Sequence, residues 1–347
     1  MRSLIINLCL LFFLGISGGM AQKINVVATL STYADIAQYI GGEHVEVKFI
    51  VSGNENAHFI RPRPSYALWL AGADLFIETG LDLELWVPAL QQKAGNPQIL
   101  SGQPGYVAVA QGIRMLDVPA VVDRSQGDVH IYGNPHVHTS PLNAKIIAEN
   151  ITRGLSRVRP ELSDYFQQRL QAFKEEIDRR MFGDVLVRLL TGEVLNRLTI
   201  QHRLIPFLQD KEYRGRPLID YLDGWMKAML PLRHRKLVAY HKNWAYFQDL
   251  FGLDIIDYLE PKPGIPPSPR HMESLISRMR QQDVRVILAA NYFSQKKVQE
   301  IAQKVNGVVV MMPLGVGGVP EVQNYFQLID YWINQLNQGF QKAYHRE

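Results

Sequence analysis

The chain has 347 residues, of which 20% are charged and 47% hydrophobic, and its formal net charge at pH 7 is +4. This length and composition predict a globular protein of about two domains with a sizeable core. The one dense basic cluster, Arg233-His234-Arg235-Lys236, has no aromatic residues interleaved with it. We therefore interpret it as the solvated entrance to a strand and expect no nucleic-acid surface.

The first 21 residues are typical of a secretory signal peptide. Arg2 precedes an apolar run from Leu4 to Ile16, and small residues lead to a predicted cleavage site after Ala21. The apolar run is too short for a good membrane span. The only cysteine, Cys9, lies in this leader with no apolar region ahead of it, so we expect no lipid anchor. A mature chain without thiols leaves His, Asp and Glu as metal ligands.

The next part of the chain alternates between strand and helix patterns. Predicted strands cover 23–30, 44–51 and 73–78, and predicted helices cover 33–40, 64–71 and 80–90. Such alternation predicts a parallel α/β sheet, in which ligands lie beyond the carboxyl ends of strands. His58 follows the strand that ends at Val51, so its position suits a ligand.

The middle of the chain carries a short loop bracketed by prolines, Asn134 to Pro141, which holds His136 and His138. Proline limits the backbone states on both sides, so we expect these imidazoles to be held out of a core. A helix is predicted over 141–158. Pro160 then stands near the first turn of a long amphipathic helix that could connect two lobes.

The last part repeats the α/β pattern after a stretch of apolar helical clusters at 181–235. Predicted strands cover 237–240, 254–259, 284–290 and 308–312, and predicted helices cover 244–251, 270–281, 295–305 and 321–339. His241 lies just past the first of these strands. Neutral imidazole is the commonest metal ligand among side chains. We therefore predict that His58, His136 and His241, far apart in sequence, converge on one metal ion.

These three histidines stand in motifs that extend over most of the mature chain. His58 is followed by Phe59 and by Pro64-Ser65; the second segment reads Asn134-Pro135-His136-Val137-His138-Thr139-Ser140-Pro141-Leu142-Asn143-Ala144; His241 precedes Tyr246-Phe247. The chain thereby resembles the zinc- and manganese-binding solute-binding proteins of bacterial ABC importers, of the cluster A-I type. The segments Gly72-Ala73-Asp74-Leu75 and Gly80-Leu81-Asp82-Leu83-Glu84 also match that family.

The resemblance implies two parallel-sheet, Rossmann-like lobes joined by a long linker helix, with the metal in the cleft between them. It implies a monomeric periplasmic carrier that delivers its ion to an ABC permease in the inner membrane and catalyses nothing itself. The corresponding plan is a signal peptide at 1–21, a first lobe at 22–158, a linker helix at 159–180, a helical insertion at 181–235 and a second lobe at 236–347. We expect the insertion to pack as an accessory subdomain.

Three features depart from the family pattern. The family's His-rich loop before the second ligand is reduced to His130, and residues 181–235 are inserted. The family's fourth ligand, an Asp or Glu, falls on Ala290 or Met312, neither of which can bind a metal. The fourth ligand is then water, Glu260, which ends a predicted strand, or His138.

Other interpretations remain open at this point. Packing is the favoured explanation for His138, metal binding is the less favoured interpretation of His130, and capping or positioning explains Glu78 and Asp82 as well as coordination does. An all-imidazole site favours Zn(II), whereas Mn(II) prefers more oxygen ligands. A manganese carrier or adhesin and a three-histidine zinc hydrolase stay as alternatives, although the sequence has no H-E-x-x-H motif.

Overall fold

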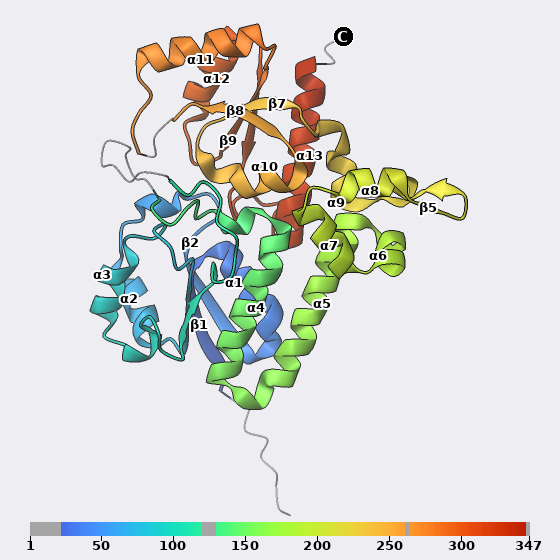
Figure 1. Ribbon diagram of the computed structural model, residues 1–347. Coiled ribbons are helices and arrows are strands. Elements are labelled where there is room, and N and C mark those ends of the chain that lie inside the picture. The colour runs from blue at the N-terminus through green and yellow to red at the C-terminus, as the bar shows by residue number, and fades with distance from the viewer. Residues whose placement is uncertain (1–21, 120–129, 261–263, 345–347) are drawn as a thin grey trace, which may run out of the picture.

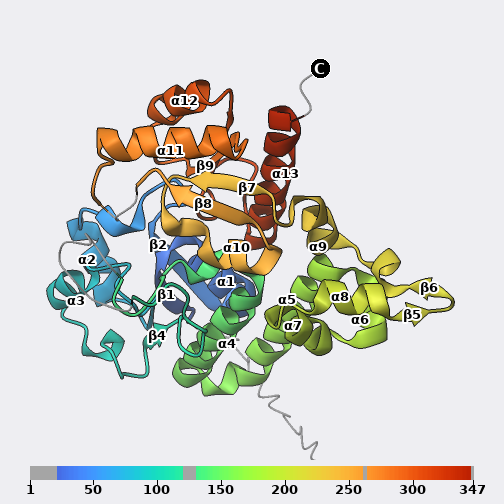
Figure 2. The same cartoon turned by 45° about the horizontal axis from the view of Figure 1, so that its top comes forward.

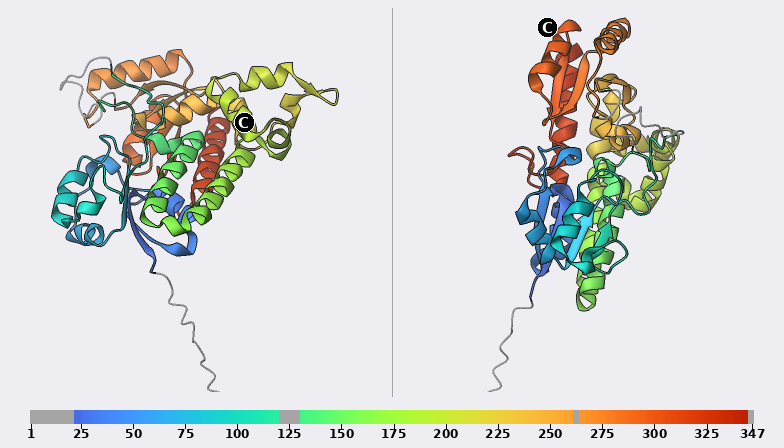
Figure 3. Two further views of the ribbon diagram at one scale, coloured as in Figure 1. Left: turned by 60° about the horizontal axis from the view of Figure 1, so that its bottom comes forward. Right: turned by 90° about the vertical axis from the view of Figure 1, so that its left-hand side faces the viewer.

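The computed structural model describes residues 22–119, 130–260 and 264–344, which form two lobes with one parallel sheet each (Figure 1). The predicted signal peptide at 1–21 lies outside these residues. The prediction of two parallel-sheet lobes is confirmed. Figure 3 shows the lobes one above the other, with the last helix, α13 (Tyr325–Tyr344), beside the second sheet.

The first lobe has the strand order β2-β1-β3-β4, with every pairing parallel. Its strands are β1 (Ile24–Leu30), β2 (Val45–Val51), β3 (Leu75–Glu78) and β4 (Tyr106–Ala108), and its helices are α1 (Ser31–Gly41), α2 (Pro64–Ala71), α3 (Val87–Ala94) and α4 (Pro141–Val158). Six of the seven residues of β1 are buried, as expected for a central parallel strand that is covered on both faces.

The second lobe has the strand order β10-β9-β7-β8, again with parallel pairing. Its strands are β7 (Lys236–Ala239), β8 (Asp254–Tyr258), β9 (Val286–Ala290) and β10 (Val308–Met312), and its helices are α10 (Ala245–Phe251), α11 (Pro269–Gln281), α12 (Gln295–Lys304) and α13. In both lobes the parallel sheets direct loops that carry histidines out of their carboxyl ends.

Helix α5 (Ser163–Phe182) runs back along α4 and also contacts α1. Its buried face includes Phe166, Leu170, Phe173 and Ile177, which matches the amphipathic pattern of the sequence. It begins three residues after Pro160, which lies in a short 3-10 turn. The helix predicted over 159–180 therefore exists, while its role as a linker and the boundaries of the parts around it stay predictions.

Residues 183–232 form the side projection seen in Figure 2, made of short helices and one hairpin. The elements are α6 (Asp184–Leu190), α7 (Gly192–Ile200), α8 (Leu204–Asp210), β5 (Glu212–Tyr213), β6 (Arg216–Pro217) and α9 (Gly224–Met229). Helices α6, α7 and α9 pack on α5, and α9 also contacts α13. Trp225 on α9 donates its indole N–H to Asp330 on α13 at 2.7 Å.

The structure differs from the sequence prediction in a few elements. No helix covers 80–86: the first helical residue is Val87, and Pro88 in the first turn suits that start. Within the stretch of predicted helical clusters at 181–235, residues 212–217 instead form a two-stranded hairpin, whose central residues Arg214 and Gly215 both have positive φ. Helix α13 starts at Tyr325 rather than at the predicted residue 321. The carboxylate of Asp35 accepts the backbone N–H of Tyr325, the first residue of the helix.

Candidate metal site

Each of the three predicted histidines leaves its lobe on a short turn at a sheet end. His58 lies in a 3-10 turn, Ala57–Phe59, whose preceding residue Asn56 accepts the His58 backbone N–H at 3.1 Å. His136 directly precedes the 3-10 turn Val137–Thr139, and His241 follows β7. His58 and His241 thus follow strands, as the sequence predicts, whereas His136 lies in the loop that leads into α4.

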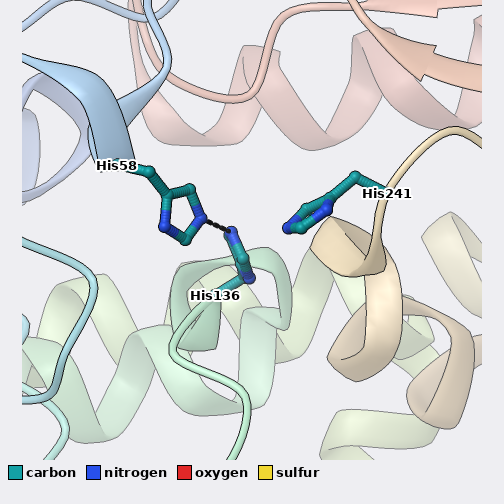
Figure 4. A group of neighbouring side chains, drawn as sticks. All are labelled: His58, His136 and His241. Atoms are coloured by element: carbon teal, nitrogen blue, oxygen red, sulfur yellow. Dashed lines mark hydrogen bonds between the residues drawn. The ribbon is translucent and has the colours of Figure 1, made fainter. Parts of the chain in front are cut away.

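The three rings face one another across the lobe boundary (Figure 4). One ring nitrogen from each of His58, His136 and His241 lies within 4.8 Å of the others. The Nε2 atoms of His58 and His136 are 3.3 Å apart. A tetrahedral zinc with Zn–N bonds of about 2.1 Å separates its ligand nitrogens by about 3.4 Å. The spacing of these two nitrogens therefore suits two ligands of one ion.

Burial keeps these imidazoles neutral. Burial lowers the pKa of His58 from 6.5 to about 3, and the cost of placing a second positive charge beside His241 or His130 acts in the same direction. Burial likewise lowers the pKa of His241 to about 4 and that of His136 well below its usual value. A histidine with a lowered pKa is unprotonated near pH 7, so each ring has a nitrogen lone pair for a cation.

Asn134 orients His136. Its side-chain oxygen accepts both the backbone N–H and the Nδ1–H of His136, at 3.0 and 2.9 Å. The proton is thereby fixed on Nδ1, and the lone pair of Nε2 faces the site. The Asn134 amide nitrogen donates to the carbonyl of Lys242 at 2.8 Å, in the other lobe. One buried amide therefore links the second histidine to the segment that follows the third.

Glu260 lies next to His241, with Oε1 3.8 Å from Nδ1. It also accepts a hydrogen bond from the backbone N–H of Gly264. The other nitrogen of His241, Nε2, is buried and has no hydrogen-bond partner within the described part of the chain. If Nε2 is the ligand atom, Glu260 stands behind the ring, where carboxylates commonly orient a ligating histidine.

The remaining candidates of the sequence analysis lie elsewhere. His138 is 2% exposed, its Nε2 is 3.2 Å from the carbonyl oxygen of Leu314, and its ring packs edge-on against Tyr33. The favoured interpretation of His138 as a packing residue agrees with these contacts. Ala290 and Met312 pair with each other at the ends of β9 and β10, fully buried, and offer no ligand atom.

A small cavity lies beside the histidines between the lobes. Its volume is about 20 Å³, and its lining includes His58 and His136 from the first lobe and Tyr292 and Leu314 from the second. A space of this size holds about one water molecule or one small ion. The arrangement thus suits the enclosure of a single cation.

Comparisons with known proteins agree with this architecture. The family model described as zinc-uptake complex component A, periplasmic (ZnuA), matches residues 26–180 and 217–339. The unmatched residues between these two ranges fall within the segment predicted as an insertion.

Within the described residues, no helix is long and apolar enough to cross a membrane.

Two curated relatives are similar over almost their whole lengths. The chain is 24% identical to the iron-binding protein YfeA of Yersinia pestis, covering 92% of this chain and 87% of the relative. It is 20% identical to the manganese ABC transporter substrate-binding lipoprotein PsaA of Streptococcus mitis, covering 92% and 90%.

Solved structures share the fold. A zinc-bound deletion mutant of ZnuA superposes with a TM-score of 0.67 at 20% identity, covering 92% of this chain and 98% of that one. A manganese-bound periplasmic metal-binding protein from Candidatus Liberibacter asiaticus gives a TM-score of 0.65 at 18% identity, covering 91% and 99%. The family match excludes the hydrolase alternative, because these proteins are transport carriers. The chain belongs to the ZnuA family, the metal-binding substrate-binding proteins that serve ABC importers.

Proposed function

We propose that this protein captures Zn(II) in the periplasm, holds it between its lobes through His58, His136 and His241, and delivers it to an ABC permease in the inner membrane. The observation that carries the proposal is the donor set. Within the described chain, the clustered candidate ligands are three imidazoles, with no carboxylate among them. Imidazole suits zinc, whereas manganese and other hard cations favour oxygen ligands.

Manganese is the second candidate cargo, because the relative PsaA is named as a manganese transporter component and YfeA as an iron-binding protein. These names describe the metals of the two relatives and not that of this chain. For this chain the decisive difference is that Ala290 and Met312 stand where the resemblance calls for an acidic ligand. Without that carboxylate the site lacks the oxygen that would favour Mn(II) over Zn(II).

The proposed carrier is a secreted monomer whose leader is cleaved near Ala21. The ligands come from both lobes, so binding of the metal ion favours the state in which the two lobes are close together. Release to the permease then requires the second lobe, with His241, to move away from His58 and His136.

The test is a zinc titration of the purified mature protein against a chromophoric chelator, repeated with Mn(II). Alanine substitution of His58, His136 or His241 should each weaken zinc binding by at least about 100-fold, because each removes a direct ligand. His44→Ala is the matched control, since that ring packs on Tyr165 away from the site. Wild-type affinity in the His241→Ala protein contradicts the interlobe site, and tighter binding of Mn(II) than Zn(II) contradicts the choice of cargo.

A further inference from the structure

A fourth imidazole, that of His130, lies against two of the three histidines of the proposed site, His58 and His136. Its ring centroid is 5.0 Å from that of His58, with the planes 28° apart, and 6.1 Å from that of His136. The side chain is 12% exposed. The centroids of the first three rings are 5.3 to 5.7 Å apart, so His130 is about as close to His58 as those rings are to one another.

One nitrogen of His130 is free to bind a cation. Its Nε2 is buried and has no hydrogen-bond partner among the residues that the structure describes. A buried polar atom without a partner costs free energy, commonly about 1–3 kcal/mol, so such atoms call for an explanation. A metal ion at the site would supply the missing partner.

The other nitrogen is held by Asp82. The Nδ1 of His130 is 3.0 Å from Oδ1 of Asp82, whose Oδ2 accepts the backbone N–H of Ile131 at 2.9 Å. The carboxylate can only accept, so the proton lies on Nδ1 and the lone pair on Nε2. A carboxylate behind a histidine in this way is the usual arrangement around zinc ligands, where it fixes the tautomer and makes the ring a better donor.

We infer that His130 is the fourth metal ligand, which makes the site a set of four imidazoles. The inference rests on the proposed function, because it assigns the open position of that site. In a tetrahedral zinc site with Zn–N of about 2.1 Å, the centroids of two ligating imidazoles are about 5 Å apart. The separation from His58 meets this value already. The 6.1 Å separation from His136 requires a shift of about 1 Å as the ring closes on the ion.

The rival donors are less well placed. Nε2 of His138 faces a backbone carbonyl, so that ring would have to break a buried contact and turn. Glu260 lies beside Nδ1 of His241 and already accepts a backbone N–H. These two carboxylates, Asp82 and Glu260, stand behind two of the four rings. Four neutral imidazoles leave the two positive charges of a divalent cation uncompensated. The negative charges of the two carboxylates together would balance them.

The experiment is zinc K-edge X-ray absorption on the purified mature protein loaded with one equivalent of Zn(II), with a chelator-competition titration on the same samples. The wild-type spectrum should fit four imidazole nitrogens at about 2.0 Å. His130→Ala should fit three imidazoles with one oxygen and bind zinc about 10- to 100-fold more weakly. His138→Ala, the matched control, should keep four imidazoles.

Asp82→Asn tests the orientation. It should keep four imidazoles but weaken binding by a smaller factor than His130→Ala, because the amide is a poorer acceptor for the Nδ1–H. An unfolding curve recorded for each metal-free variant shows whether the variant is folded before zinc is added. Three imidazoles in the wild-type spectrum, or equal affinities for His130→Ala and wild type, overturn the assignment of His130 and leave the carrier intact. Failure of the wild-type protein to bind zinc overturns the proposed function itself.

Discussion

Asn134 makes hydrogen bonds to residues of both lobes beside the site. Its amide oxygen fixes the tautomer of His136, and its amide nitrogen holds the carbonyl of Lys242 in the other lobe. The backbone carbonyl of Asn134 also accepts the hydroxyl of Tyr246 at 2.8 Å. The family resemblance has Asp at this position, so the exchange to Asn retains the acceptor for His136 and adds a donor that reaches across the lobes.

Asn134→Ala should weaken zinc binding by about 10- to 100-fold, because His136 loses the group that orients it. Asn134→Asp keeps an acceptor for the ring N–H but loses the donor to the Lys242 carbonyl. It should therefore bind zinc more tightly than Asn134→Ala and more weakly than wild type. Chelator competition on the three proteins gives the order. Equal affinities for Asn134→Ala and wild type would show that the hydrogen bonds of Asn134 do not position the ligand.

Glu84 is a second buried group with a measurable signature, on the sheet side of the first lobe. It is 3% exposed, and one carboxylate oxygen accepts the hydroxyls of Thr29 and Thr79, both at 2.7 Å, and the backbone N–H of Thr79. The other oxygen has no partner among the described residues. Burial raises the pKa of this carboxyl from 4.5 to about 7, and the nearby charge of Glu78 adds to the effect.

A carboxyl with a raised folded pKa stabilises the fold fully below its unfolded pKa, and this contribution is lost as pH rises through 7. Glu84→Gln keeps the acceptor and cannot ionise. The melting temperature of the variant minus that of wild type should therefore increase from pH 5 to pH 8. Melting temperatures of both proteins at the two pH values measure this. A difference between the proteins that does not change with pH would mean that Glu84 does not ionise in this range.

At the scale of elements, much of the fold could be predicted, because local patterns specify strands and helices in an alternating α/β chain. The run at 308–312 and the helix at 141–158 are found where the sequence predicts them. The turn at Arg214-Gly215 was missed because positive φ at Arg214 is imposed by the hairpin rather than encouraged by the residue.

The three clustered histidines could be singled out because each stands in a local signature: His58 and His241 follow strands, and His136 lies in a loop bracketed by prolines. The contact between His130 and Asp82 could not be predicted for a physical reason: the two residues are 48 positions apart in sequence. Nothing beside His130 in the chain indicates that contact. Only the folded chain brings the two residues together, with Nδ1 of His130 3.0 Å from Oδ1 of Asp82.

The side projection contacts a buried ion pair between α4 and α5 through Asn196 on α7. Lys145 on α4 donates to Asp178 on α5 at 2.7 Å, and Asn196 on α7 donates to the same carboxylate at 3.0 Å. Both charged side chains are about one-tenth exposed. Gly192 lies so close to Asp178 that a Cβ there would be 1.9 Å from a carboxylate oxygen. Helix α7 is therefore seated against this pair.

Asp178→Ala should lower the free energy of unfolding by about 3–5 kcal/mol, because it leaves the ammonium of Lys145 buried and uncompensated. The double variant Lys145→Met, Asp178→Leu should recover most of that loss, since it removes both charges and retains volume. Urea denaturation measures the difference. A double variant as unstable as Asp178→Ala would mean that packing, rather than the unpaired charge, causes the loss. Zinc affinity should stay within about threefold of wild type in both proteins, because the pair lies outside the site.

At the scale of the whole molecule, the lobes are held together by the segment that follows β10. The backbone N–H groups of Leu314 and Gly315 both donate to the carbonyl of Gly53, at 3.1 and 3.2 Å. Val316 then exchanges hydrogen bonds with Ser31 and Thr32 at the start of α1. All of these contacts lie beside the cavity at the histidines, so the lobes can separate only if they break.

This contact requires glycine at position 53. A Cβ on Gly53 would lie 2.1 Å from the carbonyl oxygen of Gly315 and 2.6 Å from that of Val316. Both are backbone atoms, which cannot move aside as the end of a flexible side chain can. Any side chain at position 53 must therefore hold the second lobe away from the first, and with it His241 away from His58 and His136.

Gly53→Ala should accordingly weaken zinc binding by about tenfold or more without altering any ligand, because part of the binding free energy is then used to force the lobes together. The matched control is Gly72→Ala, where a Cβ meets nothing within 4 Å and φ is negative. Chelator competition measures the affinities, and small-angle X-ray scattering should give a larger radius of gyration for zinc-loaded Gly53→Ala than for zinc-loaded wild type. If Gly53→Ala binds zinc as tightly as Gly72→Ala does, the site forms without this close approach, and capture does not depend on the lobes meeting at Gly53 and Gly315.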